Sequence, residues 1–131
     1  MSDSVDTIVL ENNAVYYMAR FTNDSDGTGE SAVVKVDRSA LASFKGVEPK
    51  RLNIEWIEYS IYGFNFVKLL WDATTDDEIA VLSGNGFKDY REGGGLRDPR
   101  SAGNVGDVLL TTDGAFDGAS YDITILFKLE A

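Results

Sequence analysis

The run Ser120–Glu130 constrains the fold more than any other part of the chain. Every second position in it is apolar: Tyr121, Ile123, Ile125, Phe127 and Leu129. Successive side chains of a β-strand point to opposite faces, so this spacing places all five on one face and leaves the intervening, mostly polar positions to water. The run therefore predicts a long β-strand with one face in a hydrophobic core.

Seven other segments have the composition of strands and are separated by turn residues. They are residues 7–10, 14–21, 31–36, 51–62, 64–71, 78–83 and 107–112. Eight short strands at this spacing are typical of a two-sheet β-sandwich, with a jelly roll as the leading topology. The sequence therefore predicts one all-β, jelly-roll-like domain over residues 1–131.

Two segments carry more detailed expectations. In residues 51–62 the alternation changes phase between Trp56 and Ile57, which indicates a β-bulge or a strand that crosses between the sheets. Residues 37–44 are the best candidate for a helix, because Asp37 can cap its first turn and Gly46 can end its last. We expect this short helix to plug one end of the sandwich.

The balance of charge limits the partners that the chain can have. Twelve basic and 22 acidic residues give a net charge of −10. Such a surface repels nucleic acid and anionic membranes, so we expect no direct contact with either. The acidic, polar start of the sequence lacks the pattern of a signal peptide, and no apolar run approaches the roughly 20 residues that a membrane helix needs. We therefore expect synthesis in a cytoplasm without export by a cleaved N-terminal signal.

The residue types also limit the chemistry, because the chain contains neither histidine nor cysteine. This excludes disulfides, thiolate metal sites and nucleophile pairs of the Ser-His or Cys-His kind. Paired carboxylates remain as an alternative, since Glu55, Glu58 and Asp72 lie beside aromatic residues that could stack on a sugar. We favour the interpretation that Glu55 and Glu58 are solvent-facing strand positions with no catalytic role. We expect no enzymatic activity and no cofactor.

The segment 23–30, with the sequence NDSDGTGE, has some likeness to a calcium-binding loop. With Gly27 at the bend, Asp24 and Asp26 would be oxygen ligands. The same register puts Val33 where a calcium loop requires a bidentate carboxylate, and the flanking segments are strands rather than helices. The segment is therefore predicted to be a solvated hairpin tip, with Asp24 and Asp26 as the candidate ligands if calcium binds there.

No periodicity is visible in residues 84–106, and we expect a long contact loop there. Four of the twelve basic residues of the chain lie in this loop. Long loops on a rigid scaffold commonly carry recognition, and aromatic residues with arginine are enriched at interface hot spots. The predicted partner-binding residues are Phe87, Lys88, Tyr90, Arg91, Arg97 and Arg100. Residues 1–10 could form an additional arm onto a neighbouring subunit.

Four short patterns in the C-terminal half resemble those of small structural proteins from tailed-bacteriophage virions. They are Trp71-Asp72, Leu82-Ser83-Gly84-Asn85-Gly86, Gly106-Asp107 followed by Thr111-Thr112, and Tyr121-Asp122-Ile123-Thr124. The resemblance implies a β-sandwich that serves as a capsid decoration or cement protein, bound to the major capsid protein on the capsid exterior. It also implies a homo-oligomer, with a trimer favoured, and it transfers no catalytic or cofactor residue.

Two further alternatives remain open, beside the paired-carboxylate enzyme described above. Within virions, a tail, neck or baseplate protein would have the same sequence character. In another class, a jelly-roll carbohydrate-binding module would use Trp56, Trp71 or Tyr90 as the platform for a sugar ring, which requires that the aromatic side chain be exposed.

Overall fold

The computed structural model describes residues 4–12, 15–38, 41, 51–73, 76–97, 107–114 and 117–130, and most of these residues lie in strands. The described part of the chain contains ten of them: β1 (Ser4–Asn12), β2 (Tyr16–Asp26), β3 (Val33–Val36), β4 (Arg51–Tyr62), β5 (Phe66–Trp71), β6 (Asp77–Leu82), β7 (Asn85–Asp89), β8 (Leu96–Arg97), β9 (Val108–Asp113) and β10 (Asp117–Glu130). The predicted all-β, two-sheet sandwich is confirmed.

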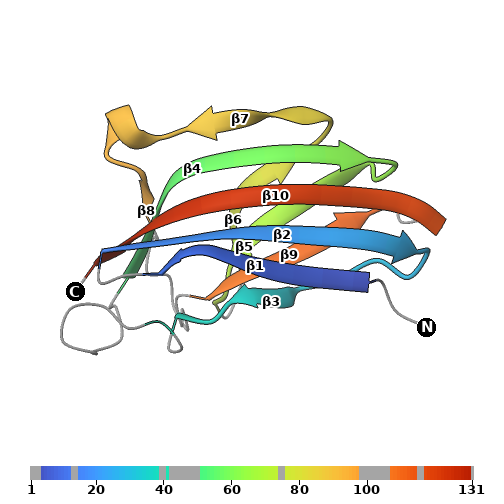
Figure 1. Cartoon of the computed structure of the whole chain (residues 1–131), viewed down its shortest axis with the longest axis horizontal. Coiled ribbons are helices and arrows are strands. Elements are labelled where there is room, and N and C mark those ends of the chain that lie inside the picture. Colours follow the sequence, from blue (N-terminus) through green and yellow to red (C-terminus); the bar gives the residue numbers. More distant parts are fainter. Residues whose placement is uncertain are drawn as a thin grey trace.

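The strands form two antiparallel sheets (Figure 1). Sheet A has the order β1-β2-β10-β4-β7, with β8 also paired to β4, and sheet B has the order β3-β9-β5-β6. The pairs are nested, because β2 pairs with β10, β3 with β9, β4 with β7, and β5 with β6. This nested pairing arises when the chain folds back on itself as one long antiparallel ribbon and the ribbon then rolls into two sheets. It is the order of a jelly roll, the topology that the sequence favoured.

The bulge expected in residues 51–62 is present in β4. Leu126 of β10 lies opposite Trp56, whereas the next residue, Phe127, lies opposite Ile54, so Glu55 is the extra residue. The bulge therefore puts Ile54 and Ile57 on the inner face of sheet A and turns Trp56 to the outer face. Both isoleucines are fully buried, and Trp56 is half-buried.

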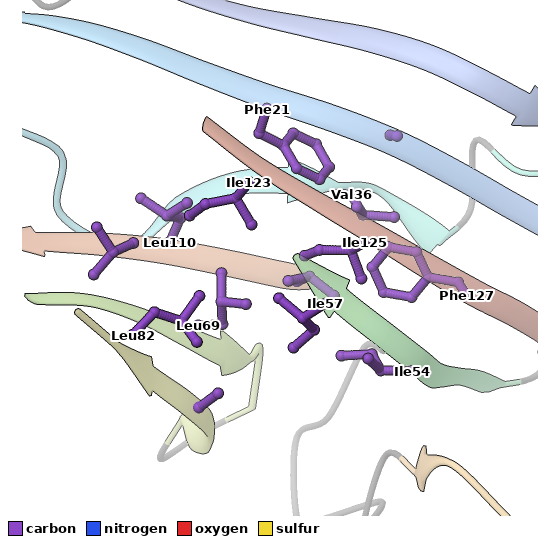
Figure 2. Packing of buried hydrophobic residues seen from close by; sticks show 14 of the residues in the cluster. Phe21, Val36, Ile54, Ile57, Leu69, Leu82, Leu110, Ile123, Ile125 and Phe127 are labelled. Carbon is purple, nitrogen blue, oxygen red and sulfur yellow. The ribbon is translucent and has the colours of Figure 1, made fainter. Parts of the chain in front are cut away.

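The core fills the space between the inner faces of the two sheets. Figure 2 shows Ile123, Ile125 and Phe127 of β10 pointing toward sheet B, where Leu69 and Leu110 face them. All five side chains are at most 1% exposed. Full burial of one such side chain stabilises a fold by about 1.5–3 kcal/mol, so this layer is the main source of stability.

A polar cluster is buried at the end of the sandwich where the chain passes from β2 to β3. The Glu30 carboxylate lies 2.6 Å from the Lys35 ammonium and accepts a hydrogen bond of 2.8 Å from the Asn23 side-chain amide and another from the Tyr121 hydroxyl. The Glu30 backbone N–H donates to the Thr112 hydroxyl of β9 at 2.9 Å. The cluster ties the β2–β3 connection to both sheets.

Two further predictions concern the N-terminal segment and the helix over residues 37–44. The N-terminal segment, expected as a short strand and an additional arm, is β1, which pairs with β2 along its length. The helix expected over residues 37–44 falls largely outside the described residues. Of that segment the structure describes residues 37, 38 and 41, where the Leu41 N–H donates to the Arg38 carbonyl.

Ile123→Ala is expected to lower the free energy of unfolding by about 2–5 kcal/mol, because it leaves a cavity between the sheets. Urea denaturation followed by tryptophan fluorescence measures the change. Val81→Ala, at a position on β6 with 46% exposure, is the control and should alter stability by less than about 0.5 kcal/mol. Equal effects of the two substitutions would contradict the position of Ile123 in the core.

Lys35→Met is expected to destabilise the protein by about 3–5 kcal/mol, because the Glu30 carboxylate is then buried without its cation. Adding Glu30→Gln to Lys35→Met should recover much of that loss, since the remaining partners are neutral. Thermal unfolding of the single and the double variant tests this. If the double variant were less stable than Lys35→Met alone, the carboxylate would be stabilised by its other partners and the ion pair would have no special role.

Candidate interaction surfaces

The predicted long loop contains regular structure, so that expectation was wrong for the described residues up to 97. Residues Asn85–Asp89 form β7, which pairs with β4 at the edge of sheet A, and Arg91–Gly93 form one turn of 3-10 helix before β8. Two glycines and three polar residues near this strand hide any alternation. The strand forms because the edge of β4 offers backbone groups that need partners. Residues 98–106 lie outside the described residues.

The glycines that follow the 3-10 turn are required by its geometry. The Tyr90 carbonyl accepts hydrogen bonds from the N–H groups of Gly93 and Gly95, and the Asn53 side-chain amide donates to the Gly94 carbonyl at 2.8 Å. Gly95 has a φ of +91°, and a Cβ atom there would lie 2.2 Å from the Asn53 side-chain oxygen. The run of three glycines is therefore part of a tight return toward β4, where Asn53 is buried.

The predicted contact residues of this segment are not equally accessible. Phe87 is 67% exposed on the outer face of sheet A, opposite Glu58. Lys88 lies opposite the buried Ile57, on the inner side, and is half-buried. Tyr90 packs against the core, and burial raises its pKa. Arg97 is in β8, but its side chain lies outside the description, as does all of Arg100.

Arg91 is held by its neighbour Asp89. Its guanidinium donates two hydrogen bonds to the Asp89 carboxylate, at 2.9 and 2.8 Å, and its backbone N–H donates a third at 3.0 Å. These bonds lower the pKa of Asp89 to about 2. Arg91 also lines a hollow of about 250 Å³ on the outer face of sheet A, with Glu11, Tyr16, Glu55 and Leu126. The arginine is thus a fixed part of this face.

A second surface lies on the opposite side of the sandwich, along the edge strands β1 and β3, and it includes most of the segment 1–10 that was predicted as an arm onto a neighbour. All nine residues of β1 are exposed. Six aliphatic side chains with 37% to 52% exposure gather on these two strands, and we call them the β1–β3 edge: Val5, Ile8, Val9, Leu10, Val33 and Val34. Figure 1 shows the two strands running along the same side of the molecule.

The candidate calcium ligands are in a strand, so the expected hairpin tip begins later than predicted. Asp24 and Asp26 belong to β2, and Asp24 pairs in register with Ser4 and Ser120 of the neighbouring strands. The Asp26 carboxylate accepts a hydrogen bond from the Thr28 N–H at 3.0 Å, which closes a local turn. Within the described residues, no three acidic side chains gather where they could hold a metal ion.

The other candidates separate in space. Of the proposed sugar platforms, Trp71 is 2% exposed in the core and cannot stack on a ligand, whereas Trp56 and Tyr90 are half-buried. Of the candidate carboxylates, Glu55 and Glu58 are on β4 in sheet A, but Asp72 follows β5 in sheet B. The described elements include no helix that could span a bilayer.

No protein-family model, no curated protein and no solved structure matches this chain.

Arg91→Ala is expected to raise the pKa of Asp89 from about 2 toward the ordinary value of 3.8, because the side-chain hydrogen bonds are lost. NMR titration of the Asp89 carboxyl carbon measures this. Since the folded pKa is below the unfolded one, the pair stabilises the fold above about pH 4 and loses that effect as the pH falls through about 2. Both side chains are accessible to solvent, so the change in stability is small. An identical titration in the variant would show that the pair does not persist in solution.

Proposed function

We propose that this protein is a non-enzymatic structural subunit of a tailed-bacteriophage virion, a capsid decoration protein that binds the major capsid lattice from outside. The observation that carries the proposal is the distribution of exposed apolar side chains over the sandwich. Eight of the ten large exposed apolar side chains in the described residues lie on two separate sides: the β1–β3 edge, and the side of β4 and β7 where Tyr62 is 70% and Phe87 is 67% exposed.

Two adhesive sides on one rigid body suit a subunit that contacts more than one neighbour. Each side is small, so each contact is weak, but contacts made together on a repeating lattice strengthen one another through effective concentration. The net charge of −10 opposes non-specific association before the protein binds the lattice. The sequence patterns that resemble small virion proteins support the same function.

The carbohydrate-binding alternative has less support. One of the two tryptophans, Trp71, is in the core. The other, Trp56, is half-buried, so its ring is only partly exposed for stacking on a sugar. The hollow beside it on the outer face of sheet A is lined mostly by charged side chains.

The test is binding of the purified protein to capsids of the phage that encodes it, prepared without this protein. We expect saturation with copies on the order of hundreds per capsid, since a lattice repeats its site many times. About a dozen copies or fewer per virion would instead indicate a neck, tail or baseplate ring. Absence from purified virions by mass spectrometry would reject the proposal altogether.

Phe87→Ala is expected to weaken capsid binding about tenfold, because a large exposed aromatic side chain at the edge is a typical hot spot. Val81→Ala removes an exposed aliphatic side chain from a different edge, on β6, and is the matched control. Equal occupancy of capsids by both variants and the parent protein would show that the β7 side is not the contact.

A further inference from the structure

The described part of the sandwich has four open sheet edges, and three of them are protected against pairing. Strand β7 is five residues long and turns Lys88 toward the inner side, and β3 is four residues long with Lys35 at a bulge. Strand β6 begins with Asp77 and Glu78. Short length, inward-pointing or edge charges and bulges are the devices by which proteins prevent edge-to-edge association.

Strand β1 has little of this protection. It is nine residues long and contains no lysine and no proline. It pairs with β2 without interruption from Ser4 to Val9, and the register shifts only beyond that point, at Leu10. Val5, Ile8, Val9 and Leu10 are all at least 39% exposed. An edge that is long, regular and aliphatic is a template for another strand.

The open edge of β1 is centred on Thr7. The Thr7 N–H donates to the Asp6 carboxylate at 3.0 Å, which indicates that the backbone groups of Thr7 face away from β2. Because the direction alternates along a strand, those of Val5 and Val9 also face the open edge. The side chains of these three residues share a face with Phe21 and Ala19 of β2, which are core residues, yet Val5 and Val9 are about half exposed. The inner face of β1 is therefore left uncovered, unlike that of β2.

We propose that β1 pairs antiparallel with β1 of a second copy of this chain, about a two-fold axis at Thr7. In this register Thr7 lies opposite Thr7, Val5 opposite Val9, and Asp6 opposite Ile8 of the second copy. The three outward-facing residues of each strand would exchange about six backbone hydrogen bonds. The two copies of sheet A would become one continuous sheet, with the Val5 and Val9 side chains packed against one another beneath it.

A second copy is the occupant that fits because β1 is complementary to itself. In this register Val5 meets Val9 and Thr7 meets Thr7, and within Ser4–Leu10 no acidic residue lies directly opposite another. A surface that pairs with itself closes after two copies, so this contact forms a dimer and cannot by itself build the trimer that the sequence resemblance favours. The inference concerns the free protein and does not depend on the proposed virion function.

The same geometry predicts how the dimer responds to charge. The two Asp6 residues are diagonal neighbours across the paired strands, and such neighbours are about 7–8 Å apart. Each subunit also carries a net charge of −10. Higher salt screens this repulsion and should strengthen the dimer. Asp6→Asn removes the repulsion at the interface and should lower the dimer Kd by about two- to fivefold.

The experiment is sedimentation analysis of the full chain over low-micromolar to millimolar concentrations. We expect a monomer–dimer equilibrium in the parent protein and in the control Thr7→Ala, which keeps the N–H. Thr7→Pro removes that N–H from the open edge and should raise the dimer Kd at least about tenfold. Its far-UV circular dichroism should match that of the parent, because this N–H is not part of the ladder with β2. If Thr7→Pro does not fold, Val5→Lys tests the same edge at an exposed position.

The register is tested by oxidation of single-cysteine variants, since the chain has no cysteine of its own. Thr7→Cys should form an interchain disulfide readily, because opposite Cα atoms are about 5.5 Å apart. Ile8→Cys places its sulfur atoms diagonally and should cross-link more slowly, and Asn85→Cys on β7 should remain monomeric. A protein that stays monomeric throughout, a trimer, or a dimer that survives both Thr7→Pro and Val5→Lys would overturn the proposal.

Discussion

The pairing of β10 with strands on both sides holds the molecule together. Strand β10 lies between β2 and β4 in sheet A, so both of its edges are saturated, and its inner face supplies Ile123, Ile125 and Phe127 to the core. Its partner β2 lies about a hundred residues away in sequence, and the other pairs are nested within this one. No sheet A can form until this long-range contact closes, and its closure brings β3 and β9 together in sheet B. We infer that the sandwich folds slowly and cooperatively, as expected when most contacts are distant in sequence.

The buried Glu30–Lys35 ion pair contributes more to selecting the correct β2–β3 crossing than to the overall stability of the fold. Burial of an ion pair is costly, and well-packed apolar residues of similar size often stabilise a fold as much. At this position, however, the chain leaves sheet A and enters sheet B, and the Glu30 carboxylate contacts side chains from β2, β3 and β10 at once. A misplaced crossing would leave a buried charge without its partner. The pair therefore penalises incorrect arrangements of the β2–β3 connection strongly.

Features set by local pattern could be predicted from the sequence, and features set by pairing partners could not. The alternation of β10 and the change of phase in β4 are visible because both strands have one face in the core. Strand β7 was missed because its Gly86 and polar neighbours obey no period, and β4 rather than β7 itself determines that a strand forms there. The burial of Glu30 was missed because its partner Lys35 sits at a bulge that only the register reveals. Arg91 was predicted as a partner-binding residue, and the sequence did not show that its guanidinium pairs with Asp89, two positions earlier.

Residues 1–10 were predicted as a possible arm, but the sequence did not show that they form an exposed edge strand of sheet A. An aliphatic edge strand has the same sequence pattern as a buried one. Only the strand order and the exposure of the side chains show that Val5 and Val9 are not core residues. All nine residues of β1 are exposed, whereas the inner face of its neighbour β2 is buried. The inner face of β1 is therefore left uncovered, although its side chains are those of a core strand. The net charge of −10 keeps such a molecule in solution through repulsion that acts over about 10 Å, whereas backbone pairing acts only on contact. Charge thus governs how often two edges meet, and complementarity of the edges decides whether they stay together.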